Sequence, residues 1–247
     1  MIFVRSTIFN ILSILWSIVS SMLMSPLLLM PRRWGQAGAR VWTHGLLFLA
    51  RVIIGLRHEV RGLENLPDGA VVIAAKHQSA WDTFLFHTLL PDPAYILKRE
   101  LFFIPFVGWL MKKTGMIGID RSRGVSALKL MVRGAAAAVA ERRQVIIFPE
   151  GTRTPPGSHR PYHPGVAMLY QSLDVDVIPV ALDSGLFWGR NSFMKKPGVI
   201  VVEFLPPMPR GLDRRAFMDL LYDRIESATE RLMNQAEQTT PAVEACG

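Results

Sequence analysis

The stretch Ala-Val-Val-Ile-Ala-Ala-Lys-His-Gln-Ser-Ala-Trp-Asp-Thr, residues 70–83, predicts a buried strand followed by a polar loop with candidate functional residues. Residues 70–75 form an apolar run without charge, which is typical of a buried strand in a parallel sheet. The sequence becomes polar at Lys76, so His77 and Asp82 follow the carboxyl end of this strand. Open α/β sheets bind their ligands in the crevice at that end. We therefore predict that His77 acts as a general base and that Asp82 holds its imidazole.

The spacing of this histidine and aspartate is weak evidence by itself, because His87 and Asp92 repeat it. His87 lies late in an apolar stretch with a helical pattern, and Asp92 lies between two prolines. We interpret the second pair as a helix end and a solvated turn. The position of His77 after a strand therefore carries the argument.

The rest of the chain alternates between strand and helix patterns. This alternation predicts an α/β fold with a mainly parallel, mixed sheet flanked by helices. Pro179 falls inside a predicted strand, where proline normally marks an edge or a bulge. The predicted strands are 70–75, 94–97, 116–119, 145–148, 177–182 and 199–204, and the predicted helices are 80–90, 106–113, 125–142, 165–172 and 214–238.

The N-terminal part predicts a membrane-embedded helical segment. Residues 7–30 are 24 residues without a charge, which is enough to cross a bilayer. Arginines follow this segment, so we read it as an uncleaved anchor with the main body in the cytoplasm. Its serines leave a helix that lies partly in the interface as the alternative. Residues 41–56 form a shorter apolar patch that predicts an interfacial or re-entrant helix pairing with the first, or a buried soluble helix. The predicted organisation is membrane-anchoring helices at 1–56, a catalytic domain at 57–238 and a flexible tail at 239–247.

The composition narrows the partners. Half of the 247 residues are hydrophobic, which is high for a soluble domain and indicates a membrane. The formal net charge of +8 suits nucleic acid, anionic lipid or an acidic protein as a partner. The sequence has no helix-turn-helix, zinc-finger or RNA-binding motif, so we expect membrane lipid and no nucleic acid. Its single cysteine, Cys246, excludes an internal disulfide. Because no His-Glu-x-x-His motif and no paired cysteines occur, we expect no metal site.

A second cluster follows another predicted strand, in Phe-Pro-Glu-Gly-Thr-Arg at residues 148–153. Arginine binds phosphate oxygens in a bidentate way, so Arg153 is a candidate for an anionic substrate group, and Gly151 with Thr152 lets the backbone approach a ligand. Arg121 is a second candidate, with a local salt bridge to Asp120 as the alternative. Glu150 either orders the loop by pairing with an arginine or is a turn residue.

At this point the sequence resembles the glycerolipid acyltransferases, and among them the bacterial 1-acylglycerol-3-phosphate O-acyltransferases. Members of this family share four ordered blocks: Asn-His-x-x-x-x-Asp, Gly-x-x-Phe-Ile-Asp-Arg, Phe-Pro-Glu-Gly-Thr-Arg and Val-x-Pro-Val. Their counterparts are at residues 76–82, 115–121, 148–153 and 177–180. The chain departs from the pattern at Lys76, where asparagine is common, and at Gly118, where an aromatic is common. From this departure we expect Lys76 to alter acceptor preference.

The resemblance implies a reaction. His77 would deprotonate the sn-2 hydroxyl of 1-acyl-glycerol-3-phosphate (lysophosphatidic acid), which attacks an acyl thioester to give phosphatidic acid in phospholipid biosynthesis. Asp82 would hold the imidazole. The substrate-binding residues would be Arg121, Glu150, Gly151, Thr152 and Arg153.

The resemblance also implies the partners and the location. The co-substrate would be acyl-CoA or an acyl carrier protein, with no other cofactor. The catalytic domain would face the cytoplasm at a bacterial inner membrane.

Three alternatives stay open from the sequence. The acceptor could be a lyso-ornithine lipid or another lysophospholipid. A hydrolase could use Ser79 as nucleophile, although Gly-x-Ser-x-Gly is absent. A membrane-binding protein without catalysis would keep His77 as a structural residue.

Overall fold

One seven-stranded sheet organises the chain, in a computed structural model that describes residues 1–239 apart from the side chains of Arg121 and Thr239. The strands are β1 (Leu56–Arg61), β2 (Val71–Ala75), β3 (Pro93–Lys98), β4 (Ile117–Ile119), β5 (Gln144–Ile147), β6 (Val177–Leu182) and β7 (Gly198–Phe204). The α-helices are α1 (Ile2–Leu23), α2 (Arg32–Leu49), α3 (Asp82–Leu89), α4 (Val107–Lys113), α5 (Val125–Ala140), α6 (Gly165–Ser172) and α7 (Arg214–Thr239). Short helical segments are η1 (Ser25–Leu29), η2 (Ala50–Ile54), η3 (Leu63–Asn65), η4 (Arg99–Phe103), η5 (Arg121–Arg123) and η6 (Ser184–Leu186).

The strand order is β1-β7-β6-β2-β5-β3-β4, and this confirms the predicted mixed sheet. Every neighbouring pair is parallel except β6 with β7. β2 lies in the middle between β5 and β6, and all five of its residues are buried. Because β2 is central, the loop that carries His77 leaves the sheet at its centre.

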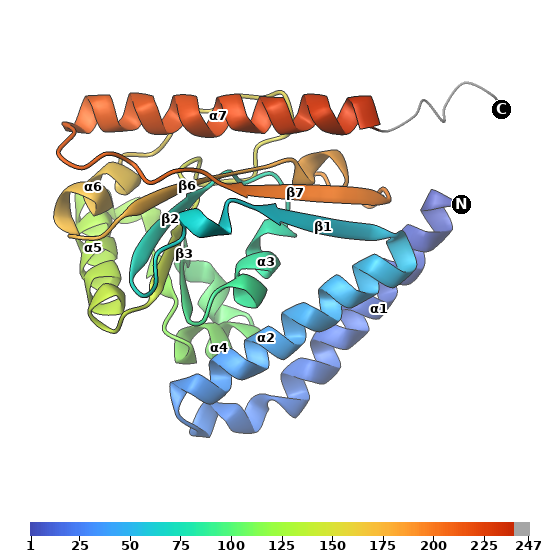
Figure 1. Ribbon diagram of the computed structural model, residues 1–247. Helices are drawn as coiled ribbons and strands as arrows, with labels where there is room; N and C mark the ends of the chain where they lie inside the picture. The colour runs from blue at the N-terminus through green and yellow to red at the C-terminus, as the bar shows by residue number, and fades with distance from the viewer. Residues whose placement is uncertain (240–247) are drawn as a thin grey trace.

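Two hydrophobic cores cover opposite faces of the sheet. Successive side chains of a strand point to opposite faces, so Val71 and Ile73 enter one core while Val72 and Ala74 enter the other. The first core includes Ile54 of η2, Trp81 and Phe86; the second includes Met131 of α5, Val166 of α6 and Phe217 of α7. Figure 1 shows α7 along one face of the sheet and α1, α2 and α3 beneath the other.

The predicted strands and helices of residues 70–238 are all present within a few residues of their expected bounds. The sequence pattern missed β1, whose residues 57–61 are mostly charged and which lies at the edge of the sheet beside β7. The expectation of an edge or bulge at Pro179 is wrong, because β6 is an interior strand. The pairs between β6 and β7 run from Val180, opposite Phe204, to Leu182. Pro179 lies just outside these pairs, so the N–H that proline lacks leaves no gap in this ladder.

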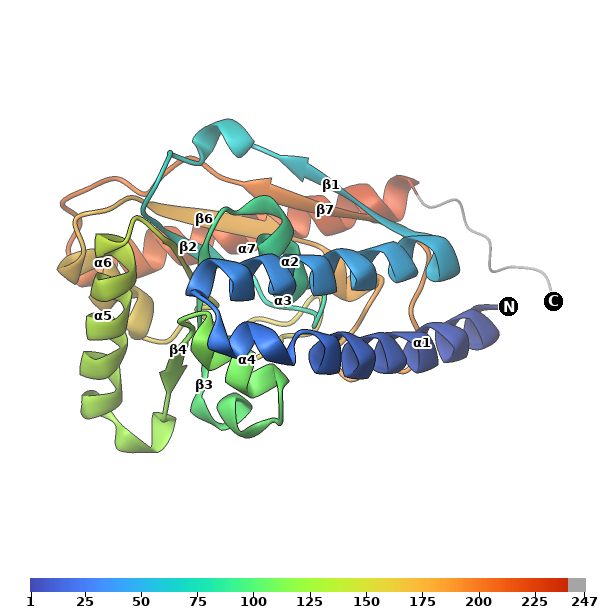
Figure 2. The same ribbon diagram turned by 90° about the horizontal axis from the view of Figure 1, so that it is seen from below.

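The N-terminal helices form an antiparallel hairpin that Figure 2 shows from below. The uncharged span at 7–30 is not one helix: α1 ends at Leu23 and Pro26 starts the separate turn η1, since proline lacks the N–H that would continue the helix. The second helix begins at Arg32, earlier than the apolar patch at 41–56 suggested, and it packs against α1 as expected. Gly45 permits close packing, because a Cβ there would lie 2.3 Å from the Trp16 ring.

Both helical segments are long and apolar enough to cross a membrane. Ile2–Leu23 has 22 residues and Arg32–Ile54 has 23, with mean hydropathies of 1.8 and 1.2. Only 11% and 28% of their most apolar windows are buried inside the protein. A signal sequence can pass the same test of length and composition.

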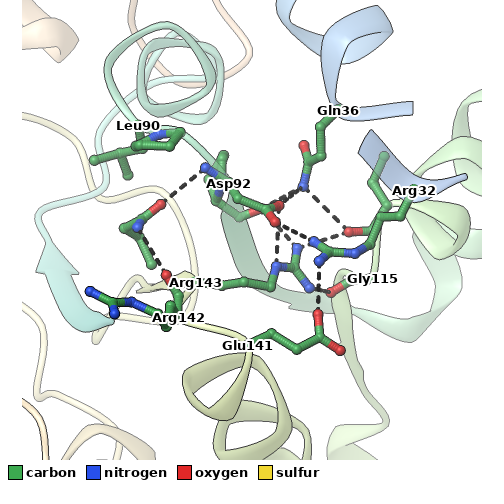
Figure 3. A network of polar contacts seen from close by, with 12 residues as sticks. Arg32, Gln36, Leu90, Asp92, Gly115, Glu141, Arg142 and Arg143 are labelled. Atoms are coloured by element: carbon green, nitrogen blue, oxygen red, sulfur yellow. Dashed lines mark hydrogen bonds and ion pairs between the residues drawn. The ribbon is translucent and has the colours of Figure 1, made fainter. Parts of the chain in front are cut away.

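A polar network attaches this hairpin to the domain (Figure 3). Asp92 forms ion pairs with Arg32 of α2 and with Arg143, whose Nε lies 3.2 Å from the carboxylate, and it accepts a 2.7 Å hydrogen bond from Gln36. Arg143 is 4% exposed in its side chain and also donates to the carbonyls of Thr114 and Pro93. Asp92 does lie in a partly exposed turn after α3, as predicted, but its carboxylate is bound by these partners as well as reached by solvent.

The predicted tail at 239–247 lies outside the described residues, apart from the backbone of Thr239.

Candidate active site

The loop after β2 brings His77 and Asp82 together. Nδ1 of His77 lies 3.0 Å from Oδ2 of Asp82, the first residue of α3. The same oxygen accepts hydrogen bonds from the backbone N–H groups of Gln78, at 2.7 Å, and Ser79, at 2.8 Å. The short spacing in sequence therefore closes a tight turn in which one carboxylate oxygen holds both the loop and the imidazole.

Asp82 is built to accept hydrogen bonds. It is fully buried, and its second oxygen accepts a 2.5 Å bond from the hydroxyl of Ser184, at the carboxyl end of β6. A carboxylate accepts hydrogen bonds, as it does here from Gln78, Ser79 and Ser184, so we assign the proton of the neutral imidazole to Nδ1. Nε2 of His77 then keeps its lone pair, as a general base requires.

Asp183, next to Ser184, adds a second buried carboxyl beneath the loop. Burial raises the pKa of Asp183 to about 7, and the nearby charge of Asp82 also raises it. Its Oδ1 accepts the backbone N–H of Val201 at 2.8 Å. Burial therefore disfavours a negative charge on Asp183, whereas the carboxylate that contacts His77 is Asp82.

The face of the imidazole packs on an aromatic ring. His77 and Phe148 stack with centroids 4.0 Å apart and planes tilted by 19°. Phe148 begins the loop after β5, the neighbour of β2, so two adjacent strands place the base and its ring support side by side.

His77 borders a cavity of about 680 Å³, which is within the range of small-molecule sites. Much of its wall is apolar and includes Phe84, Tyr95, Leu97, Leu101, Met111, Ile119, Leu128 and Met131. The polar part of the wall includes Gly151, Thr152 and Arg153. An apolar chain with a polar, anionic end fits this distribution.

The loop after β5 thus meets the expected histidine. Gly151 has a φ of 66°, a conformation that favours glycine, and its N–H donates to the carbonyl of Phe148 at 2.9 Å. The N–H of Thr154 donates to the carbonyl of His77 at 2.8 Å, which ties the two loops together. Arg153 is partly exposed, and its guanidinium lies 3.4 Å from Oδ1 of Asn191.

Glu150 has a different position from the one predicted. It is 1% exposed, one oxygen accepts the backbone N–H of His77 at 2.8 Å, and the other lies 2.8 Å from Nζ of Lys76. Its cationic partner is a lysine where the sequence suggested an arginine. The carboxylate orders the loop, and the geometry supports this role over substrate contact.

Lys76 makes no direct contact with the cavity, and its expected effect on acceptor preference stays a prediction. It is 1% exposed and its ammonium is enclosed by Glu150 and Glu226, so its side chain is not part of the described cavity wall. The side chain of Arg121 lies outside the described part of the chain. Its neighbour Asp120 pairs with Arg99 at 3.6 Å and with Arg123 at 4.0 Å.

Sequence reasoning missed Ser184 and Glu226. Ser184 follows the Val-x-Pro-Val strand, so its place at a strand's carboxyl end was a signal that could have pointed to it. Glu226 lies in α7, far along the chain, and nothing in the local sequence marks it.

A family model of acyltransferases matches residues 57–183, more than half of the chain. The chain belongs to the acyltransferase family. This acyltransferase is 38% identical over 180 residues to the 1-acyl-sn-glycerol-3-phosphate acyltransferase of Pseudomonas aeruginosa, covering 72% of this chain and 70% of that protein. It is 33% identical over 167 residues to the alpha form of that enzyme from Mus musculus, covering 66% of this chain and 59% of the mouse protein.

A solved structure shows the same fold. The crystal structure of the 1-acyl-sn-glycerophosphate (LPA) acyltransferase PlsC from Thermotoga maritima matches with a TM-score of 0.76 over 94% of this chain and 99% of that one. The sequence identity is 20%, so this likeness concerns the fold. It extends over the N-terminal hairpin and α7, which the family model leaves out.

In this acyltransferase, the serine of the hydrolase alternative does not line the cavity that His77 borders. Ser79 is fully buried, its hydroxyl accepts the N–H of Trp81 at 3.1 Å, and it is not part of the described cavity wall. The hydrolase alternative therefore lacks an accessible nucleophile at this position. No cluster of three or more potential metal ligands occurs within residues 1–239 as described.

Proposed function

We propose that this acyltransferase transfers a fatty acyl group from an acyl thioester to the sn-2 hydroxyl of 1-acyl-glycerol-3-phosphate, giving phosphatidic acid. The observation that carries the proposal is the His77–Asp82 pair at a cavity whose wall also contains Arg153. The names of the Pseudomonas and mouse relatives support this acceptor.

The chemistry follows from the geometry. Nε2 of His77 takes the proton of the acceptor hydroxyl as the oxygen attacks the thioester carbon. The tetrahedral intermediate then collapses, the carbon–sulfur bond breaks, and the leaving thiolate recovers the proton from the imidazolium. Asp82 stabilises that imidazolium, and the substrate hydroxyl takes the place that an enzyme serine has in serine hydrolases.

The acceptor would be held at its charged end. Arg153 offers a planar fork for the phosphate, with the backbone of Gly151 and Thr152 beside it. Arg121 is a further candidate for the same group. The apolar wall of the cavity suits an acyl chain, and burial of its methylenes would favour binding by about 0.8 kcal/mol each.

The donor is acyl-CoA or an acyl carrier protein, and the reaction needs no other cofactor. A thioester is already activated, so base catalysis of about 10²–10⁴-fold, together with positioning, suffices.

The site of action is a membrane surface, in our proposal the cytoplasmic face of a bacterial inner membrane. Exposed apolar residues follow one face of α1 at helical spacing, namely Val4, Ile8, Ile11, Leu15, Ile18 and Met22. Exposure of this apolar surface to water is unfavourable, and a lipid phase would cover it. An enzyme held there meets its lipid acceptor without extracting it far.

The test is an activity matrix of purified enzyme, with lysophosphatidic acid, other lysophospholipids and lyso-ornithine lipid as acceptors, against acyl-CoA and acyl carrier protein donors. We expect lysophosphatidic acid to be acylated and His77→Ala, folded by circular dichroism, to be inactive. Turnover of another lysolipid without turnover of lysophosphatidic acid would overturn the acceptor. Full activity of His77→Ala would overturn the mechanism.

A further inference from the structure

A buried ion cluster lies directly behind the catalytic loop. Lys76, the residue before His77, places its ammonium 2.7 and 2.8 Å from the two carboxylate oxygens of Glu226 and 2.8 Å from Glu150. The side chains of Lys76, Glu150 and Glu226 are 1%, 0% and 7% exposed. One ammonium thus joins two carboxylates that lie 76 positions apart in the sequence.

The cluster continues into the backbone of the catalytic histidine. Glu150 uses its first oxygen for Lys76 and its second for the N–H of His77, at 2.8 Å. The carbonyl of His77 accepts the N–H of Thr154 at 2.8 Å. Both polar groups of the His77 main chain are therefore held by the loop that Glu150 belongs to, and the direction of Glu150 is set by Lys76.

Glu226 fixes Lys76 from the other side. It lies in α7, outside the span of the family model. This helix packs on the face of the sheet opposite the N-terminal hairpin (Figure 1). The hydroxyl of Tyr162 donates to Glu226 at 2.7 Å, and Nδ1 of His159 lies 3.2 Å from it. These contacts hold the Glu226 carboxylate in one direction, because its oxygens have partners on several sides.

The charges of the three residues require one another. A buried ammonium or carboxylate is stable only with a partner, so loss of Glu226 leaves Lys76 to Glu150 alone, and loss of Lys76 leaves two buried carboxylates facing each other. An asparagine at position 76, as the resembling family commonly has, is shorter and uncharged, and could not bridge both. The lysine and the α7 glutamate therefore belong together.

We propose that Glu226 is a positioning residue for catalysis, which acts through Lys76 and Glu150 to fix the main chain of His77. The proposal rests on the proposed acyl transfer, for which His77 is the base. It gives the C-terminal helix a function in the reaction, although α7 contributes no residue to the described cavity wall.

The first experiment compares Glu226→Gln with a matched control on the same helix. Arg231 of α7 pairs with Glu203 of β7 at 2.7 Å, so Arg231→Gln removes a contact between helix and sheet without touching the cluster. We expect Glu226→Gln to lower kcat by about tenfold or more, with the acceptor KM within about twofold, because a misplaced base slows the chemical step and leaves binding intact. Arg231→Gln should leave both constants within about twofold.

The second experiment is a rescue. Lys76→Asn should lower kcat by about 100-fold, and the double variant Lys76→Asn with Glu226→Gln should recover about tenfold of that loss, because it removes the repulsion between two unpaired carboxylates. Equal loss in Glu226→Gln and Arg231→Gln, or a double variant no better than Lys76→Asn, would overturn the proposal. If Lys76→Asn fails to fold, the kcat and KM comparison of the first experiment decides. An inactive parent enzyme would instead refute the proposed function.

Discussion

Oδ2 of Asp82 lies 3.0 Å from Nδ1 of His77 while it also accepts the N–H groups of Gln78 and Ser79. One oxygen atom therefore determines both the turn of the loop and the tautomer of the base. Ser184 donates to the other oxygen, so both oxygens of the carboxylate are oriented by protein groups. Such preorganisation is what a general base needs to take a proton at the moment of attack.

We predict that Asp82→Asn lowers kcat by about 10³–10⁴-fold, because an amide nitrogen facing Nδ1 favours the wrong tautomer. The measurement is steady-state acyl transfer, with circular dichroism to establish folding. The comparison is Ser184→Ala, which removes one hydrogen bond to the carboxylate and leaves its charge. We expect that variant to lose about tenfold or less. Asp82→Asn with activity equal to the parent would contradict the role of the carboxylate.

Arg153→Lys should raise the acceptor KM by about tenfold or more with a smaller change in kcat, since lysine cannot reproduce a bidentate grip on phosphate. Acceptor kinetics at fixed donor concentration measure it. Arg210→Lys is the control, because Arg210 is an exposed residue that pairs with Asp174 and Asp176 and is not part of the described cavity wall. If Arg153→Lys and Arg210→Lys give the same KM, Arg153 does not hold the phosphate.

We predict that His87 makes the stability of the protein fall in acid. Burial, and after it the charge of Arg40, lowers the pKa of His87 to about 4 from its ordinary value of 6.5. The unfolded chain then takes up the proton first, so this contribution to stability is complete above pH 6.5 and is lost as the pH falls to about 4. Melting temperatures between pH 7 and 4 should fall less steeply for His87→Gln than for the parent. His44→Gln, at an exposed position of α2, should keep the parent's slope.

Asp92→Asn should destabilise the protein by about 1–3 kcal/mol, because Arg143 is buried and would lose its only charged partner within hydrogen-bonding range among the described residues. The change also weakens the attachment of α2 through Arg32 and Gln36 (Figure 3). Chemical unfolding in detergent measures it. Glu141→Gln, which breaks the exposed 2.8 Å pair with Arg32, should cost less than about 1 kcal/mol because solvent screens that pair. Equal effects of the two changes would show that the network adds no more than a surface contact.

The local sequence was enough to predict the central strand and most residues of the candidate site. A charge-free run at 70–75 that is short, rich in β-branched residues and preceded by Pro-Asp-Gly favours a buried strand, and polar residues directly after it are then expected at the end of the sheet. His77 and Asp82 are five positions apart, so a turn of the backbone suffices to join them. The same reasoning holds for the Gly151 loop after β5, which contacts His77 because β2 and β5 are neighbours in the sheet.

Contacts between distant segments were decided by the tertiary structure. β1 is charged and weakly patterned, and it becomes a strand because β7 supplies its hydrogen bonds. Pro26 divides the apolar N-terminal span, and α2 begins directly after Pro31, where Arg32 and Gln36 of its first turns bind Asp92. The expectation for Lys76 rests on its neighbours along the chain, whereas its ionic partners Glu150 and Glu226 come from across the fold.

The sequence by itself determined the strand, the proposed base with its acid and the loop proposed to hold phosphate, since hydrogen bonding and hydrophobic burial act there over a few residues. Only the tertiary structure decided that Glu226, 150 positions after Lys76, closes the ion cluster behind the histidine. The physical reason is that a buried charge must find an opposite charge nearby in space, and packing of α7 against the sheet determines which residue supplies it.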